Sequence, residues 1–306
     1  MITQNTQTIK KRKRRLAKHP ILRRVAVAAA FIPAVALGPI AVALAYNNMS
    51  FTSDKAFAKQ LDEAIEKALA WLKANKQTIL GKKNITLIKM LNEVNDISPQ
   101  PLFSDIITSF LATPSRPHCW NRLIDPNSHV DDVELNITID KEYLDNKWVL
   151  YAMAPDKAKV SGDQLGLFNR RKWHRRKLTH QLDALLLLKR TDGQGRNLDE
   201  LIEHLAERLS DQLVANMAVV DLYVQKVTFV LRAGHPEKIR KRWLERIIAN
   251  QRADGGWDDR WFCFTSDTRK PVFDSRGKST NQHATIQALT ALYLVKERYP
   301  EQFGLK

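Results

Sequence analysis

The stretch IIANQRADGGWDD, residues 247–259, decides the fold that this sequence predicts. Gly255 and Gly256 permit backbone angles that other residues avoid, and the Asp254 carboxylate can accept hydrogen bonds from nearby main-chain amides. Trp257 can pack back over the end of the preceding helix, while Gln251 can hydrogen-bond the turn. The stretch therefore predicts a helix that ends near residue 250, followed by a tight turn.

Apolar residues recur at helical spacing on both sides of this turn. The clearest helix is residues 54–75, where Ser53 is placed to cap the first turn. Short loops between most of the helices are typical of antiparallel helical hairpins. The predicted fold class is therefore all-α. Further helices are predicted at 178–190, 198–213, 219–231, 236–250 and 282–298, with shorter apolar stretches at 85–94 and 103–111.

Residues 115–165 interrupt the helical pattern. Apolar and polar residues alternate from Val133 to Ile139 as they do in a strand, and residues 148–153 offer a second strand to pair with it. We therefore expect a small irregular or β insertion within the helical domain. The loop from Arg252 to Asn281 is also long, and a loop of that length is either functional or disordered.

Two C-terminal segments, residues 247–259 and HATIQALTALYLV at 283–295, resemble the helical-hairpin repeat of the α/α-toroid superfamily. This superfamily includes terpenoid cyclases, protein prenyltransferase β subunits and certain pectate lyases. The segment AIEKALAWLKANK at 64–76 is similar to the first helix of another such hairpin. The resemblance implies an α/α-toroid-like domain with a cavity between its hairpins.

The same resemblance bears on metal content. Prenyltransferases hold zinc with an Asp, a Cys and a His that opens a helix, and Asp259, Cys263 and His283 follow that order at closer spacing. The alternative is a packed Cys263 thiol, because its neighbours are apolar. Cys263 and Cys119 either form one disulfide or remain free thiols. Metal and cofactor content stay unassigned.

The N-terminus carries a topology signal. The chain has a net charge of +16, and residues 1–24 hold nine Lys or Arg and no acid. Residues 25–46 contain no charged residue, and about 20 apolar residues in a helix cross a bilayer. The pattern predicts a basic cytoplasmic segment (1–24), a transmembrane signal-anchor (25–46) and an exported helical domain (47–306). The alternative is a signal peptide cleaved after Ala43-Leu44-Ala45.

This topology predicts a single-pass membrane protein whose N-terminus is cytoplasmic and whose C-terminal domain is exported, either periplasmic or otherwise extracytoplasmic. An exported domain is a poor partner for nucleic acid, so the membrane itself, an anionic lipid or glycan, or a membrane protein are the expected partners.

Four residues are candidates for acid–base catalysis. His283 opens a helix after the long loop and faces the cavity in a toroid, where Asp259 at the loop entrance could join it. His180 and Asp183 lie three residues apart and share one face of a helix. The alternatives are a solvent-facing His that caps its helix, a solvated acid, and a surface hydrogen bond.

Four further residues are candidates for substrate binding. Trp257 and Trp261 offer aromatic faces near the loop entrance. Arg175 and Arg176 belong to the basic run NRRKWHRRK at 169–177, which suits an anionic headgroup or glycan. The alternative for this run is a solvated helix start.

Together these features predict a membrane-anchored, exported α/α-toroid-like enzyme that acts on a polyisoprenoid, a lipid-linked group or an anionic glycan. The alternative is a non-catalytic envelope protein that binds a membrane-protein or cell-wall partner, with the toroid residues serving as scaffold.

Overall fold

A computed structural model describes residues 38, 41–112, 118–162, 166, 177–191, 198–216, 219, 221–258 and 280–306. The chain separates into two compact units, residues 1–47 and residues 48–306.

The predicted membrane span requires correction. Across the residues just given, no helix is both long enough and apolar enough to cross a bilayer. Of residues 25–46, the structure describes residue 38 and residues 41–46. The predictions of a transmembrane signal-anchor and of a single-pass membrane location are therefore wrong.

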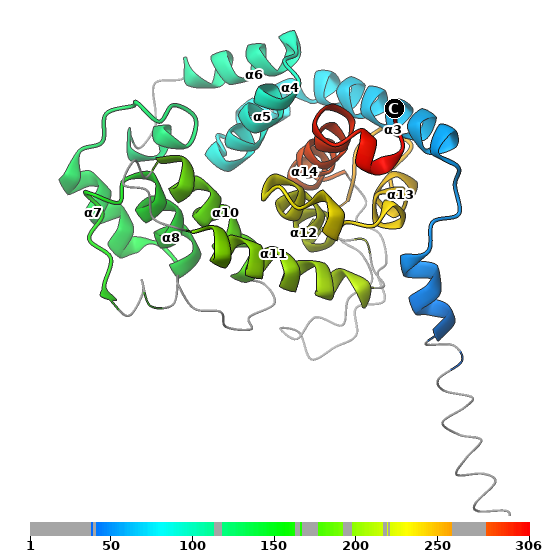
Figure 1. Cartoon of the computed structure of the whole chain (residues 1–306). Helices are drawn as coiled ribbons and strands as arrows, with labels where there is room; N and C mark the ends of the chain where they lie inside the picture. The colour runs from blue at the N-terminus through cyan, green and yellow to red at the C-terminus, as the bar shows by residue number, and fades with distance from the viewer. Residues whose placement is uncertain are drawn as a thin grey trace, which may run out of the picture. The chain divides into compact units, whose positions relative to one another are not determined.

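The second unit is built from α-helices (Figure 1), and its described residues contain no strand. The prediction of an all-α fold is confirmed for this part of the chain. The helices are α3 (Asp54–Ala74), α4 (Lys76–Gly81), α5 (Ile85–Ile97), α6 (Pro101–Leu111), α7 (Asp132–Lys141), α8 (Leu144–Met153), α10 (Lys177–Thr191), α11 (Asp199–Val214), α12 (Asp221–Arg232), α13 (Lys241–Ala249) and α14 (Gln282–Tyr293).

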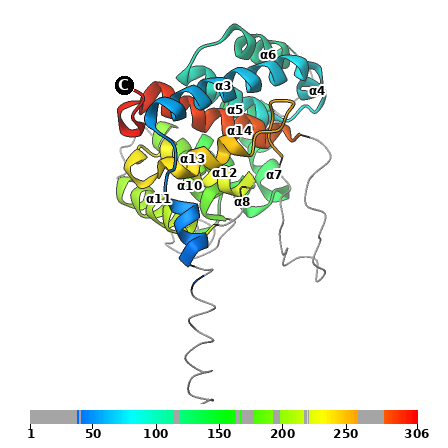
Figure 2. The same cartoon turned by 90° about the vertical axis from the view of Figure 1, so that its right-hand side faces the viewer.

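Helix α14 lies at the centre of this unit (Figures 1 and 2). It packs against α3, α5 and α12, and every one of its residues except His283 is buried. A helix that is enclosed by neighbours buries side chains around its whole circumference and not along a single stripe. The polar side chains of α14 are consequently buried as well, and His283 alone reaches a partly open environment.

The predicted β insertion is wrong, because residues 132–141 and 144–153 form helices α7 and α8. The Asp131 carboxylate accepts hydrogen bonds from the amides of Val133 and Glu134 and so caps the first turn of α7. The apolar alternation of this segment also satisfies an i, i+4 spacing, since Leu135 and Ile139 are buried on one face of the helix. The capping hydrogen bonds to Asp131 favour the helical spacing over the alternation of a strand.

The turn after α13 forms as predicted. Gly255 has a φ of +95°, and a Cβ at this position would lie 2.3 Å from the carbonyl oxygen of Lys67 in α3. The Gln251 amide donates to the carbonyls of Ala64 and Gly255, each at 2.8 Å. Trp257 is buried, and its Nε1 donates to the Ile247 carbonyl at 2.7 Å. The turn therefore attaches the end of α13 to α3 through main-chain groups.

Residues 48–53, which we call the clasp, fasten the start of the second unit to α13. The hydroxyls of Ser50 and Thr52 donate to the buried Glu245 carboxylate, and Lys241 donates to the Thr52 carbonyl at 2.9 Å. Burial raises the pKa of Glu245, but the hydrogen bonds from the two hydroxyls and a neighbouring arginine outweigh it. The pKa of Glu245 is therefore lower than usual, and the clasp is strongest with an ionised Glu245.

Candidate functional site

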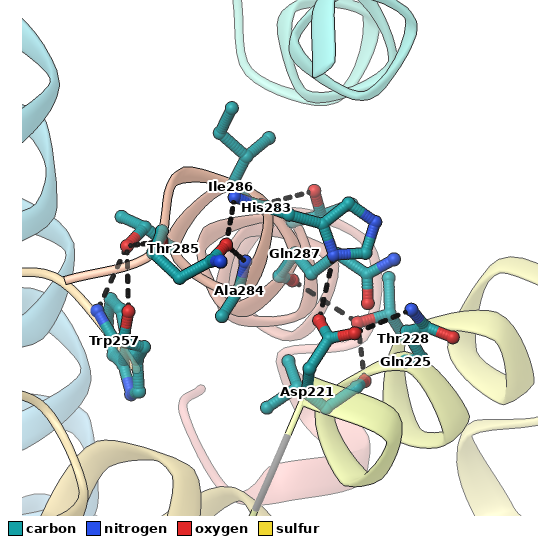
Figure 3. Close-up of polar contacts among 12 residues, drawn as sticks. Asp221, Gln225, Thr228, Trp257, His283, Ala284, Thr285, Ile286 and Gln287 are labelled. Atoms are coloured by element: carbon teal, nitrogen blue, oxygen red, sulfur yellow. Dashed lines mark hydrogen bonds and ion pairs between the residues drawn. The ribbon is translucent and has the colours of Figure 1, made fainter. Parts of the chain in front are cut away.

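His283 forms a close pair with Asp221. The Asn281 side chain caps α14 by accepting from the His283 amide at 2.7 Å, which fixes His283 in the first turn. The His283 Nδ1 then lies 2.8 Å from Asp221 Oδ1, at the start of α12 (Figure 3). The second carboxylate oxygen of Asp221 accepts from Gln225 Nε2 at 2.9 Å. A histidine is thus oriented by a carboxylate that is itself oriented by an amide.

A pocket opens beside this pair, walled by α5, α10, α12 and α14. The space available to the centres of water molecules is about 40 Å³, and one water needs roughly 10–15 Å³ by this measure. The pocket therefore holds a few waters or one small group of a larger ligand. Its lining residues are Thr86, Lys89, Met90, Glu93, His180, Asp183, Gln225, Thr228, Phe229, Arg232, His283, Gln287 and Thr290.

Four charged side chains form a compact ion cluster in the wall of this pocket. Lys89 Nζ lies 2.7 and 2.6 Å from the two oxygens of Asp183, and Arg232 donates to Asp183 at 2.8 Å. Arg232 also donates to Glu93 at 2.6 Å. The two positive and two negative charges balance, so the ion cluster gives the pocket no net charge.

The ion cluster also controls the protonation of Asp183. Burial raises the pKa of this carboxyl, but the charges and hydrogen bonds of Lys89 and Arg232 outweigh burial and hold the pKa well below its usual range. Asp183 consequently stays ionised near neutral pH, where it has little tendency to take up or release a proton.

The pocket collects three of the four residues predicted for catalysis: His283, His180 and Asp183. The side chain of His180 is exposed at the edge of the pocket. The fourth, Asp259, lies outside the described residues, so the predicted pairing of Asp259 with His283 stays a prediction.

Of the four predicted substrate-binding residues, Trp257 alone is among the described residues, and it does not line the pocket. Trp257 is buried under the turn, so its aromatic face is covered, and its main-chain amide donates to Thr285 Oγ1 at 2.9 Å. Trp261, Arg175 and Arg176 lie outside the described residues, and their roles stay predictions.

The metal prediction is likewise open. Cys263 and Asp259 both lie outside the described residues, and no group of three or more potential ligands gathers among the residues that the structure does describe. Cys119 is a free, buried thiol whose pKa is raised by that burial.

Sequence reasoning missed Asp221, Gln225, Lys89, Glu93 and Arg232. The missing information is tertiary: His283 and Asp221 are 62 positions apart, and Lys89 and Asp183 are 94 apart. The position of Asp221 in the first turn of a helix was the one available signal, since acids there are usually explained by capping.

Comparison of the chain with protein-family models, curated proteins and solved structures finds no match in any of the three. The resemblance to the α/α-toroid superfamily therefore stays a prediction, carried by the turn after α13 and by α14.

Proposed function

We propose that the protein is an enzyme in which His283, oriented by Asp221, acts as a general base on a hydroxyl group in the pocket. The observation that supports this most directly is the 2.8 Å contact between His283 Nδ1 and Asp221 Oδ1 at the wall of the pocket.

The chemistry of the pair follows from its geometry. A carboxylate that accepts from Nδ1 favours the tautomer with the proton on Nδ1, which makes Nε2 the atom that can take a proton. When Nε2 takes a proton from a hydroxyl, the ring becomes positively charged and the Asp221 carboxylate stabilises it. The Gln225 amide keeps the second oxygen of Asp221 in place, so that the carboxylate does not rotate away from the ring.

A lipid-linked or anionic glycan is the substrate class that we carry forward from the sequence. The ion cluster favours a neutral group inside the pocket, since its charges already satisfy one another. An anionic part of the substrate would instead require the basic run at 169–177, outside the pocket. The reacting hydroxyl and the anionic part are therefore separate portions of one substrate in this proposal.

The test is a turnover assay with purified protein, using oligouronates and polyprenyl-phosphate-linked sugars, with products identified by mass spectrometry. Replacing the base by His283→Gln should lower kcat by about 10²- to 10⁴-fold, the usual contribution of general base catalysis. Asp221→Asn should lower kcat by a comparable factor, because an amide that donates to Nδ1 favours the tautomer with the proton on Nε2, which cannot act as the base.

The chain offers a matched control in His235, whose Nδ1 lies 3.2 Å from Glu237 on the surface, away from the pocket. His235→Gln removes a similar His–carboxylate pair and should leave kcat unchanged. Equal turnover in the His283→Gln variant and the unmodified protein would refute the proposed role. Absence of turnover with every glycan offered would refute the substrate class.

A second candidate function is a binding protein without catalysis, which is favoured by the apolar outer face of α7. Val133 and Ile137 lie one turn apart there and are 67% and 50% exposed, and Tyr143 just beyond is 86% exposed. Adjacent exposed apolar side chains of this kind mark interaction sites. In cells that lack the protein, a Val133→Glu, Ile137→Glu variant should fail to restore its function while His283→Gln restores it; the opposite pattern supports the enzyme.

A further inference from the structure

Gln287 contains a buried hydrogen-bond acceptor that no described residue satisfies. The side chain is 4% exposed, lines the pocket, and its Oε1 receives no hydrogen bond. A buried acceptor in this state is costly, so its presence calls for a compensating donor. The pocket that Gln287 lines gives a ligand donor a route to this oxygen.

The position of Gln287 links it to His283. The two residues are four apart on α14, and residues at that spacing lie on the same face of a helix. Figure 3 shows both side chains on the side of α14 that faces α12. A hydroxyl that approaches His283 Nε2 from the pocket would therefore lie near the side-chain oxygen of Gln287.

The hydroxyl protons of Thr228 on α12 and Thr290 on α14 are already used. Thr228 Oγ1 donates to the main-chain oxygens of Val224 and Gln287, at 2.8 and 3.2 Å. Thr290 Oγ1 donates to the Ile286 carbonyl at 2.7 Å. These hydroxyls therefore supply no donor to Gln287 Oε1, and a ligand that satisfies this oxygen must bring a hydrogen-bond donor.

The opposite wall does not change this requirement. Lys89 and Arg232 direct their donors at the carboxylates of Asp183 and Glu93. An anion entering the pocket would compete with those carboxylates and meet the acceptors of α14, which is unfavourable. A neutral group with hydroxyls would neither compete with those carboxylates nor be repelled by the acceptors.

We infer that Gln287 is a specificity-determining residue whose Oε1 accepts a hydrogen bond from a ligand hydroxyl, and that the group bound in the pocket is one uncharged, hydroxyl-bearing part of a carbohydrate. This inference rests on the proposed function, because it places that hydroxyl beside His283. It also narrows the substrate: the part of the sugar that enters the pocket is uncharged, whatever charge the rest of the molecule has.

The experiment uses the full chain labelled with ¹³C at the histidine rings, and follows the His283 resonance, assigned by its loss in His283→Gln. The probes are methyl β-D-glucopyranoside, sodium D-glucuronate and inorganic phosphate. We expect saturable shifts with the neutral glycoside and weaker binding of both anions. Gln287→Leu should weaken glycoside binding by about 2- to 12-fold, the loss expected for one neutral hydrogen bond.

Gln282 on the same helix supplies the matched control. Its Oε1 is also buried and receives no hydrogen bond from a described residue, but Gln282 does not line the pocket. Both Gln→Leu variants should raise the melting temperature by about 2–4 °C, since each removes a costly buried acceptor. Only Gln287→Leu should weaken binding of the glycoside.

Three binding results would overturn the inference: equal glycoside binding by the Gln287→Leu and Gln282→Leu variants, tighter binding of either anion, or no shift of His283 with the glycoside. None of these refutes the general-base role, which fails only when His283→Gln retains turnover. A lowered melting temperature for Gln287→Leu would show that Oε1 is satisfied without a ligand, and would also overturn the inference.

Discussion

Replacing Asp183 by Asn should destabilise the protein strongly, because it removes the central negative charge of the ion cluster without changing the shape of the side chain. Lys89 and Arg232 both bond to Asp183, and all three side chains are largely buried. Removing one partner from a buried ion pair costs about 3–5 kcal/mol, because the remaining charges are left uncompensated. For a domain of this size, we expect the melting temperature to fall by about 6–20 °C.

The matched control is Asp62→Asn, which breaks the Asp62–Lys296 pair on the surface. The distance of that pair, 2.7 Å, is close to the Lys89–Asp183 distance of 2.6 Å, but its side chains are 54% and 42% exposed. An exposed pair contributes at most about 1 kcal/mol. Circular dichroism melts of both variants at pH 7 provide the comparison, and equal shifts would refute the reasoning from burial.

Acid titration gives an independent check on the same charge. The pKa of Asp183 is lowered on folding, so its ionised form stabilises the protein fully above the unfolded pKa of about 3.9. That contribution is lost only as the pH falls through the lower, folded pKa. The melting-temperature difference between the unmodified protein and Asp183→Asn should therefore stay constant from pH 7 to pH 5; a difference that disappears in this range would contradict the assigned pKa direction.

Three further predictions concern the scaffold. Gly255→Ala should lower the melting temperature clearly, because the Cβ meets a main-chain oxygen at 2.3 Å and the φ is positive, whereas Gly81→Ala, with nothing within 4 Å, should not lower it. Glu245→Gln should destabilise the clasp at pH 7, and in urea unfolding its effect should shrink as the pH falls below about 4.5, because the lowered pKa of Glu245 makes the ionised form the stabilising one. Trp257→Phe should cost about 0.5–1.5 kcal/mol in the same assay, since the Ile247 carbonyl loses the indole donor and keeps the Asn250 amide; an unchanged unfolding midpoint would mean that water replaces the indole.

The sequence predicts most of what depends on neighbouring residues. Ser53 caps α3 as expected, because an N-cap needs only the amides of the next turn. The turn at Gly255 also follows from local chemistry. The segment at 133–139 misleads because its apolar spacing fits two periods, and Asp131, which caps the helix, precedes the alternating stretch.

The candidate site is predicted only in part, for a physical reason. His283 and His180 stand out as residue types suited to catalysis, but an isolated side chain has no defined environment. Asp183 was paired with His180 on its own helix, whereas its partners Lys89 and Arg232 come from two other helices. Long-range electrostatic pairing is decided by packing, and the packing partners of α14 are distributed over most of the chain.

The clasp has a mechanical consequence. The hydrogen bonds of Ser50, Thr52 and Lys241 connect the first residues of the second unit to α13, nearly two hundred positions later in the sequence. Tension applied through the chain that precedes residue 48 would therefore load α13 and the clasp together before it could peel α3 from the bundle. The N-terminal end of this unit should therefore resist pulling, and the force needed to unfold it should depend on the charge of Glu245.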